Sequence, residues 1–190
     1  MKYIIYFYVI FVANNVMAFE VDRWPGEGMP IVSFKSKNVN ICLRPVLGST
    51  CRLVEAIPNK KILFSSEHSS NIESGFKYIQ SKTITVKSVK MVVKNEFDIA
   101  GYGRKCSKGK INLKKDETIN NLAYEAEGYY FLEIRGSVCS VFLDEYSEHL
   151  LNSHLNPEQQ WWAKFEHLKT GHIGWIHVTR NNFNFLDRSF

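Results

Sequence analysis

The sequence predicts a mainly β protein with little helix. Val, Ile, Thr, Tyr and Phe dominate its patterned stretches, and these side chains suit the pleated, half-buried surface of a sheet. Long runs of helical periodicity are largely absent. Two segments, 128–141 and 161–176, each pass from aromatic residues through a glycine to aliphatic residues, which is typical of a β-hairpin. These observations favour a protein built from short strands.

The expected strands follow one another along the chain. Residues that favour strands predict them over 31–34, 39–43, 51–56, 61–64, 83–87, 89–93, 111–113, 119–124, 129–134 and 138–143. Within 83–93 the apolar side chains change from even-numbered to odd-numbered positions. Such a shift moves every side chain to the other face, so we expect a bend or bulge at 87–88. Residues 144–151 predict one or two helical turns, and a final hairpin follows Pro157.

The first 18 residues have the pattern of a secretory signal peptide. Lys2 supplies a positive start, an apolar run covers 3–12, and Val16 and Ala18 stand at the small-residue positions read by a signal peptidase. The apolar run is about ten residues long, whereas a membrane-spanning helix needs about 20. A buried N-terminal strand is the alternative. We expect cleavage after Ala18, export, and no stable insertion into a membrane.

Four cysteines follow this segment, and they predict two disulfides. An even number in an oxidising compartment is typical of disulfide bonding, although three connectivities are possible. We favour Cys42 with Cys51, which would close a short loop, and Cys106 with Cys139. Each bridge would add about 2–4 kcal/mol to the free energy of unfolding. Four buried free thiols are the alternative, and the spacing lacks the Cys-x-x-Cys pair of a zinc site.

Charge is distributed unevenly along the chain. The net charge is +5, but residues 77–115 contain eleven Lys and Arg against two acidic residues, whereas 116–190 contain five against eleven. A basic middle could attract an anionic polymer or steer a charged partner. The alternative is that these lysines only mark the solvated faces of strands. Nucleic acid is not expected as the partner of an exported protein.

The histidines and carboxylates give no convincing catalytic or metal-binding pattern. His167, His172 and His177 recur every five positions, and on one strand this places successive side chains on opposite faces. His149 and His154 lie in an acidic segment that is typical of a solvated surface. A cysteine nucleophile would need one of the four cysteines to stay reduced. We therefore expect no enzymatic activity, no metal and no cofactor.

Two separated segments resemble the two ends of a bacterial SH3 domain. Segment 39–50, with Leu43-Arg44-Pro45 and Gly48-Ser49-Thr50, is similar to the opening strand and polar loop, and segment 161–176, with Gly174-Trp175-Ile176, is similar to the closing hairpin. The chain from residue 19 onward resembles a family of uncharacterised exported bacterial proteins with SH3-like barrels. Shorter motifs shared with that family are Ser81-Lys82-Thr83, Tyr102-Gly103, Ala126-Glu127-Gly128-Tyr129 and Asp187-Arg188-Ser189-Phe190.

This resemblance implies SH3-like barrels and a location in the Gram-negative periplasm, and it carries no established activity. The opening and closing motifs lie too far apart for one ordinary barrel, so the chain holds either two barrels or one heavily elaborated barrel. We expect two small β subdomains. Residues 19–109 would contain the SH3-like opening, and residues 110–190 would form the C-terminal SH3-like subdomain.

Aromatic side chains are the candidate ligand contacts. They are Trp161, Trp162, Trp175, Tyr129 and Tyr130, whose flat amphipathic rings suit a glycan or a peptide. Neighbouring strand residues face opposite sides, so we expect Trp162 to be buried and Trp161 to be more exposed. The sequence thus predicts a non-enzymatic periplasmic protein that recognises peptidoglycan or a peptide. The alternative is a periplasmic inhibitor or immunity-type protein that binds one exported enzyme.

Overall fold

The computed structural model describes residues 19–21, 30–64, 73–102, 106 and 109–186. The expected signal peptide at 1–18, Gly103 and the motif at 187–190 lie outside the described residues. Strands make up 59% of the structure and helix 6%, which confirms the mainly β prediction. The expected helical turn is the 3-10 helix η2 (Leu143–His149).

Short strands form most of the described chain. In chain order they are β1 (Glu20–Val21), β2 (Ile31–Phe34), β3 (Asn38–Cys42), β4 (Cys51–Glu55), β5 (Ile62–Leu63), β6 (Phe76–Lys87), β7 (Val89–Val93), β8 (Phe97–Gly101), β9 (Gly109–Leu113), β10 (Thr118–Ala126), β11 (Tyr129–Ile134), β12 (Ser137–Phe142), β13 (Leu150–Leu151), β14 (Glu158–His167), β15 (His172–His177) and β16 (Phe183–Phe185).

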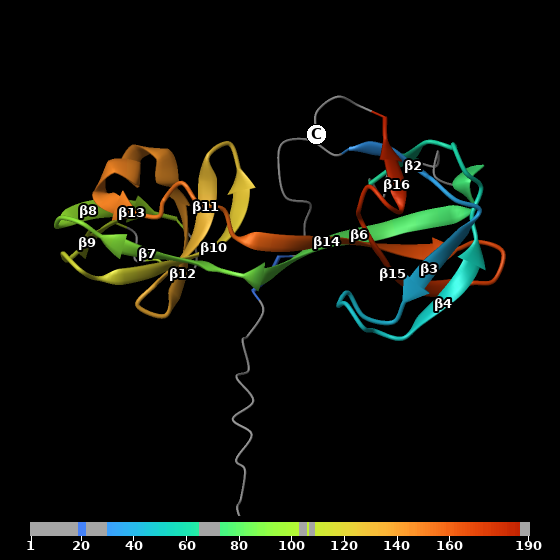
Figure 1. The fold of residues 1–190 in the computed structure, drawn as a ribbon, viewed down its shortest axis with the longest axis horizontal. Coiled ribbons are helices and arrows are strands. Elements are labelled where there is room, and N and C mark those ends of the chain that lie inside the picture. Colours follow the sequence, from blue (N-terminus) through green and yellow to red (C-terminus); the bar gives the residue numbers. More distant parts are fainter. Residues whose placement is uncertain (1–18, 22–29, 65–72, 103–105, 107–108, 187–190) are drawn as a thin grey trace, which may run out of the picture.

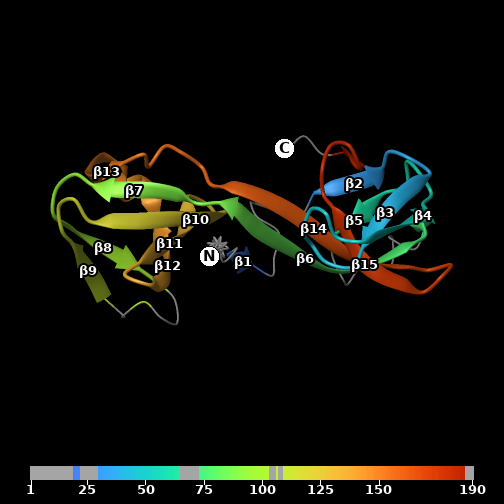
Figure 2. The same ribbon diagram turned by 60° about the horizontal axis from the view of Figure 1, so that its bottom comes forward.

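The strands gather into two lobes at opposite ends of an elongated molecule (Figures 1 and 2). We call β1 and the described residues of 30–87 and 158–186 the terminal lobe, and the described residues of 89–151 the inserted lobe. The long strands β6 and β14 run between them and pair antiparallel along their length, from Lys87 opposite Glu158 to Phe76 opposite His167. The inserted lobe is therefore an insertion between two neighbouring strands of the terminal lobe.

The terminal lobe encloses an aromatic core between two sheets. Its six-stranded sheet has the order β1-β6-β14-β15-β3-β4, and its three-stranded sheet has the order β16-β2-β5. Phe34, Phe64, Phe76, Phe165 and Phe183 are fully buried in this core. Their ring centroids lie 4.8–6.2 Å apart for the contacting pairs, which is the spacing of favourable aromatic packing.

The inserted lobe has a separate, mainly aliphatic core. Its five-stranded sheet has the order β12-β11-β10-β7-β13, and the hairpin β8-β9 packs beside it. Met91, Ile99, Leu113, Ile119 and Leu132 are fully buried there. The buried residues of this core all come from residues 91–150, and those of the terminal-lobe core all come from residues 32–78 and 163–183.

The expected bend at 87–88 is present. Strand β6 ends at Lys87 and β7 begins at Val89, and the two strands belong to different sheets. The change of phase in the apolar pattern therefore marks the point where the chain leaves the terminal lobe. The chain returns after β13 and enters β14, which forms with β15 the final hairpin expected after Pro157.

Two architectural expectations are not confirmed by the structure. None of the sheets closes into a barrel, so the SH3-like barrel is not confirmed, and the six-stranded sheet stays open with β1 and β4 at its edges. The cores also do not follow the boundary expected between residues 109 and 110, which falls inside β9. The physical reason is the pairing of β6 with β14, which returns the last strands of the chain to the sheet of the first ones.

Each lobe contains one disulfide, in the pairing that we favoured. Cys42 and Cys51 lie opposite each other on β3 and β4 of the terminal lobe. Cys106 is joined to Cys139 on β12, and both are buried in the core of the inserted lobe. The cross-links therefore restrain each lobe separately.

Candidate functional site

A pocket of about 500 Å³ opens beside the Cys42–Cys51 disulfide. Its apolar wall is formed by the disulfide with Ile41, Leu43 and Ile173, and its polar wall includes Arg52 and His172. Its residues come from β3, β4, the loop between these two strands, and the first two residues of β15. A mostly apolar concave surface with a few polar groups is the usual form of a ligand site.

The strand geometry explains why the pocket forms. Strands β15 and β3 share a single register pair, Trp175 with Cys42. Gly174 permits this close approach, because a Cβ there would lie 2.6 Å from the carbonyl oxygen of Cys42. Beyond this point the ladder ends, and Ile173 belongs to the pocket wall instead of pairing with the chain that leaves β3.

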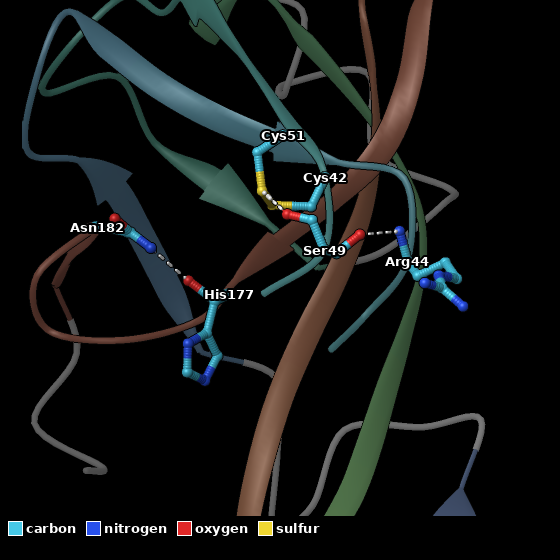
Figure 3. Close-up of a disulfide and its surroundings, with 6 residues drawn as sticks. All are labelled: Cys42, Arg44, Ser49, Cys51, His177 and Asn182. Atoms are coloured by element: carbon cyan, nitrogen blue, oxygen red, sulfur yellow. Dashed lines mark hydrogen bonds between the residues drawn. A yellow bond between two sulfur atoms is a disulfide. The ribbon is translucent and has the colours of Figure 1, made fainter. Parts of the chain in front are cut away.

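The disulfide closes a compact loop, within which Ser49 lies beside the backbone of Arg44 (Figure 3). The Leu43 amide donates to the Thr50 carbonyl at 3.0 Å, and the Arg44 amide donates to Ser49 Oγ at 3.0 Å. These bonds order a loop on which Leu43 is 71% exposed and Leu47 is 61% exposed. Apolar side chains held outward in this way are typical of a contact surface.

The Arg52 guanidinium lines the pocket and has no acidic partner among the described residues. It contacts the ring of His172 instead. By contrast, Glu55 at the end of β4 pairs with Lys37 at 3.1 Å and Lys169 at 3.5 Å, which holds the pKa of its carboxyl below the ordinary value. The pocket rim is therefore cationic and suits an anionic group.

Two of the predicted ligand contacts are buried in a small cluster next to this site. Trp162 is 2% exposed and Trp175 is 7% exposed, and they pack with Cys42 and Ile84. The ammonium of Lys164 lies 5.7 Å from the ring of Trp175, with a second lysine at 5.9 Å. These two tryptophans therefore pack against Cys42 of the pocket lining, and their buried rings are not available to a ligand.

The other predicted contacts lie apart from this cluster. Trp161 is partly buried against the terminal-lobe core, so it is more exposed than Trp162, as expected from their opposite faces. Tyr129 and Tyr130 belong to β11 of the inserted lobe. Tyr129 packs on Phe142 with ring centroids 5.3 Å apart, and Tyr130 lines a second pocket between the lobes. The structure thus divides the five predicted residues among three places, namely the small tryptophan cluster, the terminal-lobe core and the inserted lobe.

The histidines have structural contacts. His167 and His172 lie opposite each other on β14 and β15, and His167 bonds to Thr170 at 2.7 Å and to the Glu55 carbonyl at 2.8 Å. The ring of His149 stacks on Phe97 at 4.8 Å. Within the described residues, no group of His, Cys, Asp and Glu could hold a metal ion. No helix in the described part of the chain is long and apolar enough to cross a membrane.

Because of His177, we expect the free energy of unfolding of the terminal lobe to fall on acidification. Its half-buried ring stacks on Trp162 with centroids 4.5 Å apart, and burial lowers the pKa of His177 below its ordinary value of 6.5. The unfolded chain therefore takes up the proton first as the pH falls. This stabilisation is present above pH 6.5 and is lost as the pH falls through the folded pKa.

Urea unfolding at about pH 7.5 and about pH 5.5 measures this effect. We expect the midpoint to fall more between the two pH values in the wild type than in His177→Gln, because the variant keeps every other titrating group. An equal fall in both proteins would show that His177 does not couple to folding.

Sequence reasoning missed most of the pocket. Leu43, Arg52 and Ile173 were not among its candidates. The apolar residues inside the short loop between Cys42 and Cys51 were an available signal, because a solvated turn ordinarily contains polar residues. The short pairing of β15 with β3, which ends beside the pocket, could not be predicted from any pattern in the sequence.

Comparisons with models of known protein families, with curated proteins and with solved structures find no match to this chain. Function is therefore inferred from the pockets themselves.

Proposed function

We propose that the chain is a non-enzymatic binding protein of the periplasm that recognises a peptide, including the peptides of peptidoglycan, at the pocket beside Cys42–Cys51. The observation that carries this proposal is a mostly apolar pocket of about 500 Å³ whose lining includes Arg52, a cation without an acidic partner among the described residues. Two disulfides support export into an oxidising compartment. We assign the SH3-like unit to the terminal lobe, whose small antiparallel sheets surround one aromatic core.

The chemistry of the pocket favours a peptide with an apolar side chain and a nearby carboxylate. An aliphatic or aromatic side chain would displace water from Ile41, Leu43 and Ile173. A carboxylate would accept charge-assisted hydrogen bonds from Arg52, and such bonds are stronger than neutral ones. The apolar contacts would make binding persist at physiological salt, where exposed charge interactions are screened.

Co-sedimentation of residues 19–190 with purified peptidoglycan sacculi tests this proposal at low and at physiological salt. We expect retention at both, and a loss of about tenfold or more in Ile173→Asp, which buries a charge against the ligand. Leu168→Asp is the matched control, because Leu168 is 41% exposed in the same lobe and does not line the pocket.

Treatment of the sacculi with an amidase that removes the stem peptides identifies the part recognised. Retention through this pocket should then disappear. No retention of the wild type at either salt, or equal retention of Ile173→Asp, would overturn the proposal. Retention only at low salt would mean charge attraction by the basic segment 77–115.

A second candidate function is a periplasmic inhibitor or immunity-type protein. Two further apolar side chains from the same part of the chain are exposed outside the pocket lining, Leu47 at 61% and Leu53 at 60%, which favours a contact wider than a single side chain. A stoichiometric complex with one exported enzyme in size-exclusion chromatography, broken by Leu47→Asp, would support this function over peptide recognition.

A further inference from the structure

A second pocket of about 510 Å³ lies where the two lobes meet. The inserted lobe contributes Tyr124 from β10, Tyr130 from β11 and Asp144 from η2, and the chain returning to the terminal lobe contributes Asn156 and Gln159. None of these residues lines the pocket beside the disulfide. The site combines residues of the inserted lobe with residues of the segment that returns to the terminal lobe.

The two tyrosines form one wall of this pocket. Their ring centroids lie 5.1 Å apart with the planes at 66°, so the rings present a face and an edge at an angle. They are register partners on β10 and β11, and the ladder has irregularities on both sides of Tyr124. Gly128, also at the pocket, has φ +80, and a Cβ there would lie 2.6 Å from the ring of Phe142. The glycine is therefore required for the tight turn that places Tyr130.

The pocket lining also carries hydrogen-bonding groups, and not all of them have a partner within the described residues. Tyr130 Oη donates to Asn156 Oδ1 at 3.3 Å. Gln159 Nε2 is buried and has no hydrogen-bond partner among the described residues. The Asp144 carboxylate has no basic partner in the described chain, and its charge, after burial, helps to raise the pKa of Tyr130. The site thus offers a carboxylate acceptor, an amide donor and an aromatic face.

We infer that this pocket binds a hydroxylated sugar ring. The C–H face of a sugar packs on an aromatic ring, and its hydroxyls both donate and accept hydrogen bonds. Asp144 would accept from one hydroxyl, and Gln159 Nε2 would donate to the oxygen of another. A buried donor without an acceptor is costly, so the ligand must supply an acceptor to Gln159.

An organic cation is the competing ligand chemistry, and it fits less well. An ammonium group would be attracted by the faces of Tyr124 and Tyr130 and by Asp144. It has no acceptor, however, so it would leave Gln159 Nε2 unpartnered. The donor and acceptor set therefore favours a neutral polyhydroxylated ring. This inference does not rest on peptide recognition at the disulfide pocket.

Titration of residues 19–190 with chitotriose, a neutral sugar oligomer without peptide, tests the inference by calorimetry. We expect saturable binding that Asp144→Asn and Gln159→Met each weaken by about tenfold, as for a hydrogen bond to a charged or buried group. Glu145→Gln is the matched control, because Glu145 is an exposed neighbour of Asp144 that does not line the pocket. Ile173→Asp should also bind chitotriose normally.

Three outcomes would overturn the inference. The first is no saturation well above about 1 mM chitotriose, the weak end of specific recognition. The second is binding that neither Asp144→Asn nor Gln159→Met changes. The third is tighter binding of tetramethylammonium than of chitotriose. Failure here with retained binding to intact sacculi would leave peptide recognition standing, so the two proposals fail separately.

Discussion

Phe165→Ala is expected to lower the free energy of unfolding of the terminal lobe by about 3–5 kcal/mol. Phe165 is fully buried, and its ring contacts the rings of Phe34, Phe64, Phe76 and Tyr78 at 5.8–6.2 Å. Truncation removes the apolar area and leaves a cavity that strands on all sides prevent from collapsing. The inserted lobe should keep its stability, because its core contains no residue of the terminal lobe.

Hydrogen exchange resolved by residue measures this difference. Amides of β14, β15 and β2 should exchange faster in Phe165→Ala, whereas those of β10 and β11 should be unchanged. Phe185→Ala is the control, because Phe185 is only partly buried against the same core and its truncation should cost less. Equal acceleration in both lobes would show that the lobes unfold as one unit.

Loss of the Cys106–Cys139 disulfide is the second large effect. A bridge between residues 33 apart is expected to contribute about 3.7 kcal/mol by restricting the unfolded chain, and one between residues 9 apart about 2.6 kcal/mol. The paired variant Cys106→Ala/Cys139→Ala should therefore be less stable than Cys42→Ala/Cys51→Ala by about 1 kcal/mol. Burial of Cys106 and Cys139 in the core acts in the same direction, because alanine fills less space.

Urea unfolding of the two paired variants tests this order. Limited reduction followed by alkylation and mass spectrometry gives an independent readout. Cys51 is exposed whereas Cys139 is fully buried, so label should enter at Cys42 and Cys51 first. Equal stability of the variants, or earlier labelling of Cys106 and Cys139, would contradict the separate roles of the bridges.

The local pattern of the chain was enough to predict several features. The change of apolar phase near residue 88 marked the point where the chain leaves one lobe. The alternation of strand side chains placed Trp162 inside and Trp161 at a more exposed position. Both succeed because a strand has a period of two, so the face of each side chain follows from its position alone.

Features that depend on distant strands could not be predicted in this way. The expected boundary near residue 110 does not coincide with the division between the two cores. That division depends on the pairing of β6 with β14 across the inserted lobe, which has no local sequence pattern. Trp162 and Trp175, which we expected to contact a ligand, are instead buried in a cluster next to the pocket. The sequence of a strand does not tell which face of its sheet other residues cover.

The sequence by itself determined the mainly β class, the cysteine inventory and the alternation of buried and exposed side chains, because each of these depends on neighbours in the chain. Only the tertiary structure decided the two lobes and the two pockets. The single contact of β15 with β3 opens one pocket, and the meeting of the lobes brings Tyr130, Asp144 and Gln159 together in the other. These arrangements arise from contacts between segments far apart in the sequence, and no pattern of neighbouring residues specifies such contacts.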